Sequence, residues 1–417
     1  MVINLKLKFL KIIAVVCCAI LPWNATAVNH GSMADLLLNQ KFGKSLVESL
    51  LVKSLLEITQ GNTKQAFATI NELICTAPNF KLAYLIRGDL LSAQGRGLES
   101  LGNANLALAS KTNSDQIEGL RQEARTRIDY YLSDKKNHQI PNLLVKLSPE
   151  QTHVIVVDTV KSRLYVYKNA DNKLQYVADY YVTIGKNGAG KQAQGDKRTP
   201  LGVYFAGKKL TQPLADMYGS GAYPLNYPNE LDQHQNKNGY GIWLHGTPTN
   251  TYSRPPRASD GCVVLSNPDL SSLAPILQTG KVPVIISDNI EWLNPTKSDF
   301  QSNEQKSLSE SIEDWRKDWV SQNADKYLSH YSEQFFYSDG NYQKWADYKR
   351  VVQSAKPKVS INIDKVSMFS YPNLKENIVV VNFEQDFKSA TLQNKMLKRQ
   401  YWINQNNQWK IIYEGAI

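Results

Sequence analysis

Two residues whose side chains can cooperate in nucleophilic catalysis, Cys262 and His245, each stand beside a short apolar run. Residues 241–244 read Gly-Ile-Trp-Leu, which predicts a buried strand that ends at His245. Cys262 follows a glycine and precedes the apolar run of residues 263–265. A buried cysteine is usually inert, and a lone histidine at a strand end is more often structural. Together, however, they have the composition of a thiol nucleophile and its base, which predicts acyl transfer.

The residues around this pair resemble a known family. His245-Gly246, followed by Ser259-x-Gly261-Cys262, resembles the signature of the L,D-transpeptidase (YkuD-type) catalytic domain, and the resemblance covers roughly residues 150–290. It includes an upstream Thr-Pro-Leu-Gly at residues 199–202. The resemblance implies a mostly-β domain that acts on bacterial peptidoglycan and uses the backbone carbonyl of Gly246 to orient His245. One departure is that many members carry Arg in a Gly-Cys-x-Arg pattern, where this chain has Val263, Val264 and Leu265.

Several neighbouring residues are candidates for binding substrate or the oxyanion. The backbone N–H groups of Gly261 and Cys262 are placed by the sequence to stabilise a tetrahedral intermediate. Arginines in the loop between base and nucleophile could hold a carboxylate of a stem peptide, or could simply be solvated. The candidate substrate-binding residues are Tyr252, Arg254, Arg257 and Ser259, and Ser259 could equally be structural within its loop.

The resemblance leaves the reaction open among related outcomes. Attack by Cys262 on the meso-diaminopimelate carbonyl of a tetrapeptide stem would release the terminal D-alanine. An amine acceptor makes the enzyme an L,D-transpeptidase, which is our first expectation, and water makes it an L,D-carboxypeptidase. A lipoprotein-releasing amidase would use the same nucleophile, and a non-catalytic cell-wall binding module is the alternative from another class. No metal or organic cofactor is implied, since the six histidines show no ligand spacing.

The first residues predict export. Three lysines precede an apolar run at residues 12–21, and Ala-Thr-Ala at residues 25–27 is a small-residue cleavage site. We therefore expect a signal peptide at residues 1–27, with cleavage after Ala27, and a periplasmic mature protein. Of the two cysteines that remain, Cys75 is expected in a helix core and Cys262 as a thiol. The net charge of +10 favours attraction to a polyanionic envelope, and no basic motif indicates nucleic-acid binding.

The flanking regions predict further domains in a multidomain α+β chain. Residues 28–135 show helical spacing that resembles tetratricopeptide helix pairs; too few units are visible for a free-standing array, so a packing partner, such as a second copy, is expected. Residues 133–150 and 288–310 read as polar linkers. Residues 305–417 begin with a helix expected to reach Phe335 and continue with long strands, an order that resembles the nuclear-transport-factor-2-like (NTF2-like) cone. Such a domain implies a ligand pocket or a dimerising role.

Three further features of the catalytic region carry expectations. Residues 185–192 nearly match a phosphate-binding loop, but Gln192 replaces the Ser or Thr that would hold Mg²⁺, so we expect a flexible connection. His153 is expected to be structural. His234 lies in a hydrophilic stretch and is expected to be solvated, although it is the second candidate for the base. Asn267 or Asp269 is expected to cap the helix that follows Cys262.

Overall fold

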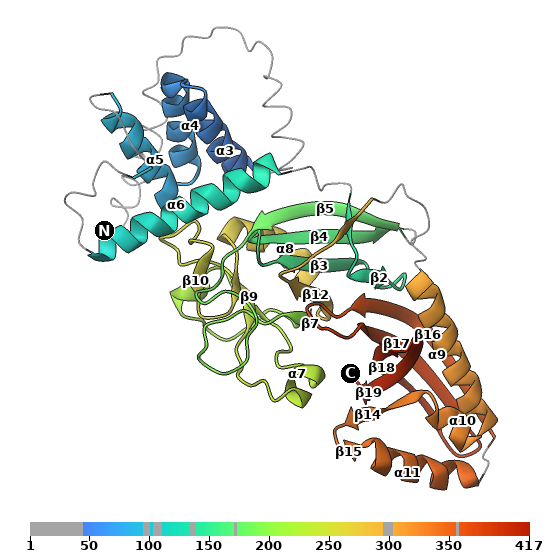
Figure 1. Ribbon diagram of the computed structural model, residues 1–417. Helices are drawn as coiled ribbons and strands as arrows, with labels where there is room; N and C mark the ends of the chain where they lie inside the picture. Colours follow the sequence, from blue (N-terminus) through green and yellow to red (C-terminus); the bar gives the residue numbers. More distant parts are fainter. Residues whose placement is uncertain are drawn as a thin grey trace, which may run out of the picture. The chain divides into compact units, whose positions relative to one another are not determined.

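The computed structural model describes most of the chain in two compact units (Figure 1). The described residues are 45–94, 101–102, 111–133, 139–170, 173–294, 303–355 and 358–417. The expected signal peptide at residues 1–27 lies outside them. One unit comprises residues 1–134 and 247–256, and the other comprises residues 135–246 and 257–417. Helices dominate the first unit and strands the second, which confirms the predicted multidomain α+β class.

The first unit is built from helices at the predicted positions: α3 Leu46–Thr59, α4 Thr63–Thr76, α5 Lys81–Ser92 and α6 Lys111–Leu132. The Ser45 side chain accepts a hydrogen bond from the Glu48 N–H and so caps α3. On α4, Ala66, Ile70 and Leu73 recur at helical spacing and are buried. Cys75 is exposed, so its predicted core position is wrong. It lies two residues beyond Leu73, a rotation of about 200° that carries it to the opposite side of the helix.

The middle domain in the second unit is built on a five-stranded sheet. The strand order is β5 Lys173–Tyr181, β4 Arg163–Ala170, β3 His153–Asp158, β12 Val282–Ser287 and β7 Gly202–Ala206. β12 runs parallel to β3 and antiparallel to β7. Smaller sheets join β11 Val263–Val264, β9 Trp243–His245 and β8 Ala222–Pro224, and pair β10 Arg257–Ser259 with β6 Ile184–Gly185. Buried Val, Ile and Leu side chains from these sheets form one core with α8 Asn267–Leu277.

The cap of α8 differs from the prediction. Ser266, not Asn267 or Asp269, is the N-cap, because its hydroxyl accepts from the Asp269 N–H at 3.2 Å. Asn267 lies one residue inside the helix, and its Oδ1 instead accepts from the Ser220 N–H at 2.8 Å. The Asn267 side chain thus holds the loop at Ser220 and does not cap α8.

The C-terminal domain curves a seven-stranded sheet around aromatic side chains. The order is β15 Gly340–Asn341, β14 Tyr331–Tyr337, β19 Gln408–Ala416, β18 Gln393–Gln405, β17 Ile378–Ser389, β16 Val359–Ser370 and β2 Leu144–Lys146. Three helices, α9 Asn303–Ser321, α10 Ala324–Leu328 and α11 Tyr342–Ser354, contribute to the same core. The predicted helix through Phe335 is wrong, because Gln322 has a positive φ of 56° and Asn323 starts α10 as its cap. Phe335 lies in β14.

The two segments expected to be linkers are partly structured. β1 Ile140–Pro141 pairs with β13 Trp292–Leu293, so residues on either side of the middle domain meet. β2 adds the last strand to the C-terminal sheet, and the Ser148 N–H donates to Ser367 Oγ at 3.0 Å. Short strands of two or three residues carry too little periodicity for a sequence pattern to reveal them, because their partners lie far away in the chain.

Polar and aromatic contacts join the middle domain to the C-terminal sheet at α7 Glu230–His234. Glu230 accepts hydrogen bonds from the Tyr401 hydroxyl at 2.7 Å and from Arg399 at 3.3 Å. The His234 ring stacks on Phe336 with ring centroids 3.8 Å apart and an angle of 3°. His234 is therefore packed between domains rather than solvated as expected, and partial burial lowers the pKa of its imidazole.

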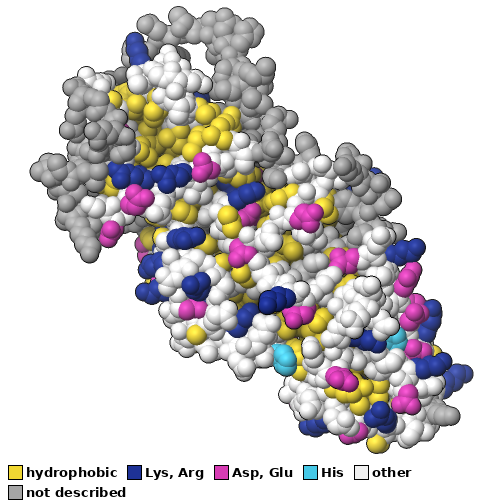
Figure 2. Space-filling view, in the orientation of Figure 1, with side chains coloured by type: hydrophobic (Ala, Val, Ile, Leu, Met, Phe, Trp, Pro, Cys, Tyr) yellow, Lys and Arg dark blue, Asp and Glu magenta, His cyan; other side chains and the backbone are white. Residues whose placement is uncertain are grey.

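The charged side chains are mixed on the surface. On the face shown in Figure 2, lysine and arginine side chains are interspersed with aspartate and glutamate rather than gathered in one patch. Among the described residues, none of the helices combines the length and the apolar character needed to cross a bilayer. On this face the charges are therefore mixed, and the net charge of +10 belongs to the chain as a whole.

Candidate active site

The two candidate catalytic residues lie on neighbouring parallel strands. His245 is the last residue of β9, and Cys262 immediately precedes β11. In this pairing Val264 lies beside His245, so Cys262 stands two residues before the partner of the histidine. The Leu265 N–H donates to the His245 carbonyl at 2.9 Å and fixes the register beyond the strand. The thiol and the imidazole, seventeen positions apart in sequence (262 − 245), are thus brought to adjacent strands.

His245 is buried, and a backbone carbonyl holds its ring. Only 2% of the residue is exposed, and Nδ1 lies 2.7 Å from the Gly246 carbonyl oxygen. A carbonyl can only accept, so Nδ1 carries the hydrogen in this arrangement and Nε2 keeps its lone pair for the proton of a thiol. The Tyr218 ring packs edge-on against the imidazole with centroids 5.1 Å apart. This is the orientation that the resemblance implies for Gly246, whereas the catalytic role stays a prediction.

A tight turn presents Cys262, which is partly exposed. The Ser259 hydroxyl donates to the Cys262 carbonyl at 2.6 Å and accepts from the Gly261 N–H at 3.1 Å. The Cys262 thiol lies 3.3 Å from the Gly241 carbonyl, which precedes the strand of the base. These bonds engage the Ser259 hydroxyl inside the turn, and contact of Ser259 with substrate stays a prediction. The N–H of Gly261, predicted to bind the oxyanion, would have to leave Ser259 to do so.

Glycine is required at position 261 by both conformation and space. Gly261 has φ +128°, and a Cβ there would lie 2.8 Å from the Arg198 carbonyl oxygen. We expect Gly261→Ala to lower the free energy of unfolding by about 1–3 kcal/mol and to reduce turnover, because the turn that carries Cys262 must shift. Urea denaturation and steady-state rates measure this. The matched control is Gly188→Ala, at φ +82° but facing open space, which should cost less. Equal effects at the two positions would contradict the steric explanation.

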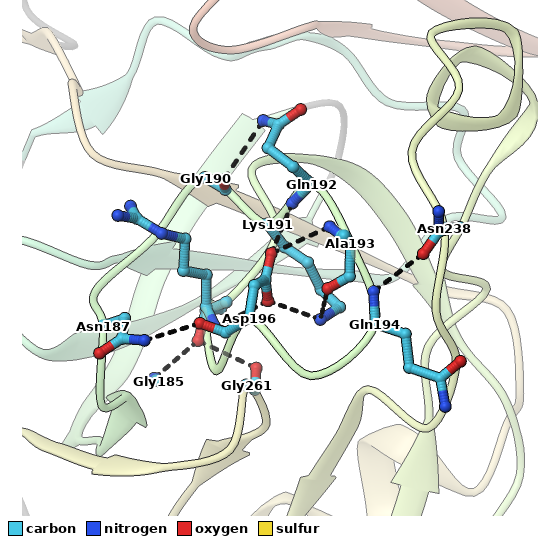
Figure 3. A network of polar contacts seen from close by, with 12 residues as sticks. Gly185, Asn187, Gly190, Lys191, Gln192, Ala193, Gln194, Asp196, Asn238 and Gly261 are labelled. Carbon is cyan, nitrogen blue, oxygen red and sulfur yellow. Dashed lines mark hydrogen bonds and ion pairs between the residues drawn. The ribbon is translucent and has the colours of Figure 1, made fainter.

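Figure 3 shows a hydrogen-bond network that organises residues 185–199 around the carboxylate of Asp196. The carboxylate accepts from the N–H groups of Gln192 (2.7 Å) and Ala193 (3.0 Å) and pairs with Lys191 at 2.8 Å. The backbone N–H groups of Gln192 and Ala193 are therefore already bonded to a carboxylate of the same loop. The expected flexible connection is instead a loop held by internal hydrogen bonds and an ion pair.

The same loop supports the turn of the nucleophile through Thr199. Its hydroxyl donates to the Gly261 carbonyl at 2.9 Å and accepts from the Gly185 N–H at 2.9 Å. Thr199 belongs to the Thr-Pro-Leu-Gly run of residues 199–202. Through Thr199, this run links Gly185 in β6 to Gly261, the residue before Cys262.

Asp196 is expected to stabilise the protein above acidic pH. Partial burial alone would raise its pKa, but hydrogen bonds from Lys191 and three backbone N–H groups lower the pKa to about 2, against 3.8 ordinarily. Because the folded-state value is depressed, the stabilisation is present above pH 3.8 and is lost as the pH falls through about 2. We expect Asp196→Ala to lower the free energy of unfolding by about 2 kcal/mol at neutral pH. In urea titrations, a difference from the parent that persists at pH 2 would contradict this reason.

The four candidate substrate-binding residues divide between the two units. Tyr252 and Arg254 belong to the helical unit, whereas Arg257 and Ser259 belong to β10 of the second unit. Arg257 is exposed and Tyr252 is half-buried. Their contact with substrate stays a prediction.

The structure also identifies supporting contacts that the sequence did not predict. Tyr218 packs on His245, and its carbonyl accepts from the Gly246 N–H at 3.1 Å. A Cβ on Gly246 would clash with Asn267 Oδ1, so Asn267 closes the space behind the carbonyl that holds the histidine. Arg198 is exposed, and its backbone lies against Gly261. An unusual density of Gly and Asn in this region was the only sequence signal for these contacts. Within the described ranges, no group of three or more His, Cys, Asp or Glu could hold a metal ion.

Comparison with known proteins agrees with this geometry. The family model "L,D-transpeptidase catalytic domain" (YkuD) matches residues 152–286, which include both His245 and Cys262. The middle domain belongs to the L,D-transpeptidase family. A second model, "Cds6 C-terminal NTF2-like domain", matches residues 307–415 and confirms the predicted C-terminal fold. No curated protein matches the chain.

Solved structures resemble about two thirds of this chain. Bd1075 of Bdellovibrio bacteriovorus is 28% identical, with a TM-score of 0.57, over 67% of this chain and 98% of its own. The helical cell shape determining protein Pgp2 of Campylobacter jejuni is 25% identical, with a TM-score of 0.56, over 71% of this chain and 100% of its own. The chain therefore contains an L,D-transpeptidase catalytic domain, and it has residues beyond the part that these structures match.

Proposed function

We propose that the protein is an exported enzyme of peptidoglycan processing that transfers an acyl group through a thioester on Cys262. The observation that carries the proposal is the buried His245, whose Nδ1 is held 2.7 Å from the Gly246 carbonyl on the strand beside β11. In this tautomer Nε2 carries the lone pair that can accept the thiol proton. A free thiol has a pKa near ~8.5, so a base that takes its proton is needed for rapid attack at neutral pH.

The proposed reaction proceeds in two steps. The Cys262 thiolate attacks the meso-diaminopimelate carbonyl of a tetrapeptide stem, forming a C–S bond and an oxyanion. The oxyanion collapses and the C–N bond to D-alanine breaks, with the leaving amine taking its proton from the His245 imidazolium. In the second step an acceptor attacks the thioester, His245 removes the acceptor's proton, and the thiolate leaves.

The acceptor decides between two activities, and we place L,D-transpeptidation by an amine first. Water as the acceptor gives an L,D-carboxypeptidase, and one observation favours this second candidate. The position of the arginine in the family's Gly-Cys-x-Arg pattern is taken by Val264, which is 2% exposed and lies in β11. No cation at that position can hold a carboxylate near the nucleophile. The similarity to Pgp2, a helical cell shape determining protein, adds a role in cell shape to the proposal.

Digestion of disaccharide-tetrapeptide by the mature protein, followed by mass spectrometry, tests this function. Cross-linked dimer, or exchange of the terminal D-alanine for an added D-amino acid, is the expected result for a transpeptidase. Tripeptide alone would identify the carboxypeptidase. Cys262→Ala serves as the control and should give neither product. Absence of turnover, together with peptidoglycan binding that survives Cys262→Ala, would support a binding module instead.

The periplasmic location is part of the same proposal, because intact peptidoglycan is found only outside the cytoplasmic membrane. The basic start, the apolar run of residues 12–21 and the Ala-Thr-Ala at residues 25–27 support export. Fractionation of cells followed by N-terminal sequencing checks this: the proposal predicts a periplasmic protein that begins at Val28.

A further inference from the structure

The segment of residues 247–256 joins the candidate base to the candidate nucleophile, yet it packs within the helical unit rather than the catalytic one. It begins directly after Gly246 and ends six positions before Cys262 (262 − 256). Within the helical unit, Pro255 of this segment lies next to Gly119 of α6. The segment is therefore a loop of the active site whose folded environment comes from a different part of the chain.

The turn between α4 and α5 makes one set of contacts with this segment. The Asn79 carbonyl accepts from the Tyr252 N–H at 3.1 Å, and the Asn79 amide donates to the Thr249 carbonyl at 3.0 Å. The Phe80 ring, 1% exposed, packs on the Tyr252 ring with centroids 4.9 Å apart. Backbone and side-chain contacts at adjacent residues fix both the position and the direction of the loop.

Helix α6 makes a second set. The Ser253 hydroxyl donates to Glu123 Oε1 at 2.5 Å, and Arg127 Nη2 pairs with the same oxygen at 2.8 Å. Glu123 and Arg127 are 0% and 2% exposed. Pro255 lies over Gly119, where a Cβ would approach Pro255 Cγ to 2.8 Å. The ion pair of Glu123 and Arg127 binds the Ser253 hydroxyl, and Gly119 leaves space for Pro255. This face of α6 is therefore complementary to the loop.

The loop is also closed on itself next to the base. Thr247, 1% exposed, donates its hydroxyl hydrogen to the Tyr252 carbonyl at 3.2 Å. Thr247 directly follows Gly246, whose carbonyl oxygen lies 2.7 Å from His245 Nδ1. A displacement of Tyr252 therefore reaches, through one hydrogen bond and one peptide unit, the carbonyl that orients the imidazole.

We propose that the helical unit is a positioning element of the active site, which holds Tyr252, Ser253 and Pro255 and thereby fixes the Gly246 carbonyl against His245. Phe80, Glu123 and Gly119 are positioning residues and do not touch substrate. The inference rests on the proposed acyl transfer at Cys262. It predicts that loosening the loop lowers kcat and slows reaction of the thiol, while KM changes little, because the effect acts through the base.

The sharpest test uses one substitution at two glycines of the same unit. Alanine has a higher helix propensity than glycine, so Gly119→Ala should not weaken α6. The new methyl group, however, displaces Pro255. Gly88→Ala, in α5, faces open space and is the matched control. We expect Gly119→Ala to lower kcat about ten-fold, in the range of changes that act through a contact network, with an unchanged melting temperature. Gly88→Ala should match the parent in both.

A double-mutant cycle separates positioning from direct substrate contact. Phe80→Leu and Tyr252→Leu each remove one ring of the pair. If the rings act through each other, each single variant lowers kcat and the double variant is no slower than the slower single variant. Effects that multiply in the double variant would overturn the proposal, because Tyr252 would then act independently of the helical unit.

Alkylation of Cys262 by iodoacetamide, in a Cys75→Ser background, tests the inference without substrate. The parent should react faster than a Gly119→Ala variant by about ten-fold, and Gly88→Ala should equal the parent. If the parent fails to turn over tetrapeptide but this ranking holds, the proposed substrate is wrong and the positioning role stands. If the parent turns over and Gly119→Ala equals Gly88→Ala in both assays, the positioning role is wrong.

Discussion

Replacing Cys262 with alanine is expected to reduce turnover of disaccharide-tetrapeptide by about 10⁴-fold or more. The thiolate is the group proposed to form the covalent bond to the acyl carbon, and alanine offers no nucleophile in its place. The substitution removes one sulfur from a partly exposed turn whose backbone is fixed by Ser259 and Thr199. The folded state should therefore change little, with a melting temperature close to that of the parent. Initial rates by chromatography of the released products give the measurement.

The control for Cys262→Ala is the other cysteine of the expected mature protein. Cys75 is exposed on α4 in the helical unit, so Cys75→Ser should retain the parent rate. Measurable turnover by Cys262→Ala at more than about one hundredth of the parent rate would rule out a thioester mechanism at this residue.

Replacing His245 with glutamine is expected to lower kcat by about 10³-fold, because the amide cannot take the thiol proton. KM should change less, since His245 is buried and the candidate substrate-binding residues lie elsewhere. The pH dependence should also change: hydroxide at high pH can remove the thiol proton, so the variant should regain part of its rate above pH 8.5. Steady-state rates between pH 6 and pH 10 measure both effects.

The effects of His245→Gln and Cys262→Ala on the turnover rate should not multiply in the double variant. A base without its nucleophile does nothing, so the double variant His245→Gln, Cys262→Ala is expected to be no slower than Cys262→Ala alone. His234→Gln is the matched control, since that imidazole stacks on Phe336 at the C-terminal domain. A His234→Gln variant as slow as His245→Gln would indicate that the base was misassigned.

Cys262 and His245 could be singled out together because each lies beside a short apolar run: His245 follows one and Cys262 precedes another. The strands of the C-terminal domain were equally visible, since β17 Ile378–Ser389 and β19 Gln408–Ala416 carry long apolar and aromatic patterns that local propensity alone predicts. Elements whose partners lie far away could not be found in this way. β2 Leu144–Lys146 is a strand only because β16 lies beside it.

The sequence predicts which residues of the candidate site could do chemistry, but it does not predict the contacts that support them. The donation of the Gly261 N–H to Ser259 depends on a turn with φ +128°, which the sequence permits but does not specify. The packing of residues 247–256 on Phe80 and Glu123 joins segments more than 100 residues apart, and no local pattern encodes such a contact. Tertiary contacts decide where a polar loop lies, whereas propensity decides mainly where helices and strands lie.

The most direct measurement of the central claim is the mass of the intact protein during turnover of disaccharide-tetrapeptide, after rapid acid quenching. The proposed mechanism predicts a transient gain equal to the substrate mass less that of D-alanine, located by peptide mapping on Cys262 and absent from Cys262→Ala. Turnover at the parent rate with an adduct on another residue, or product formation by Cys262→Ala, would contradict acyl transfer through this thiol.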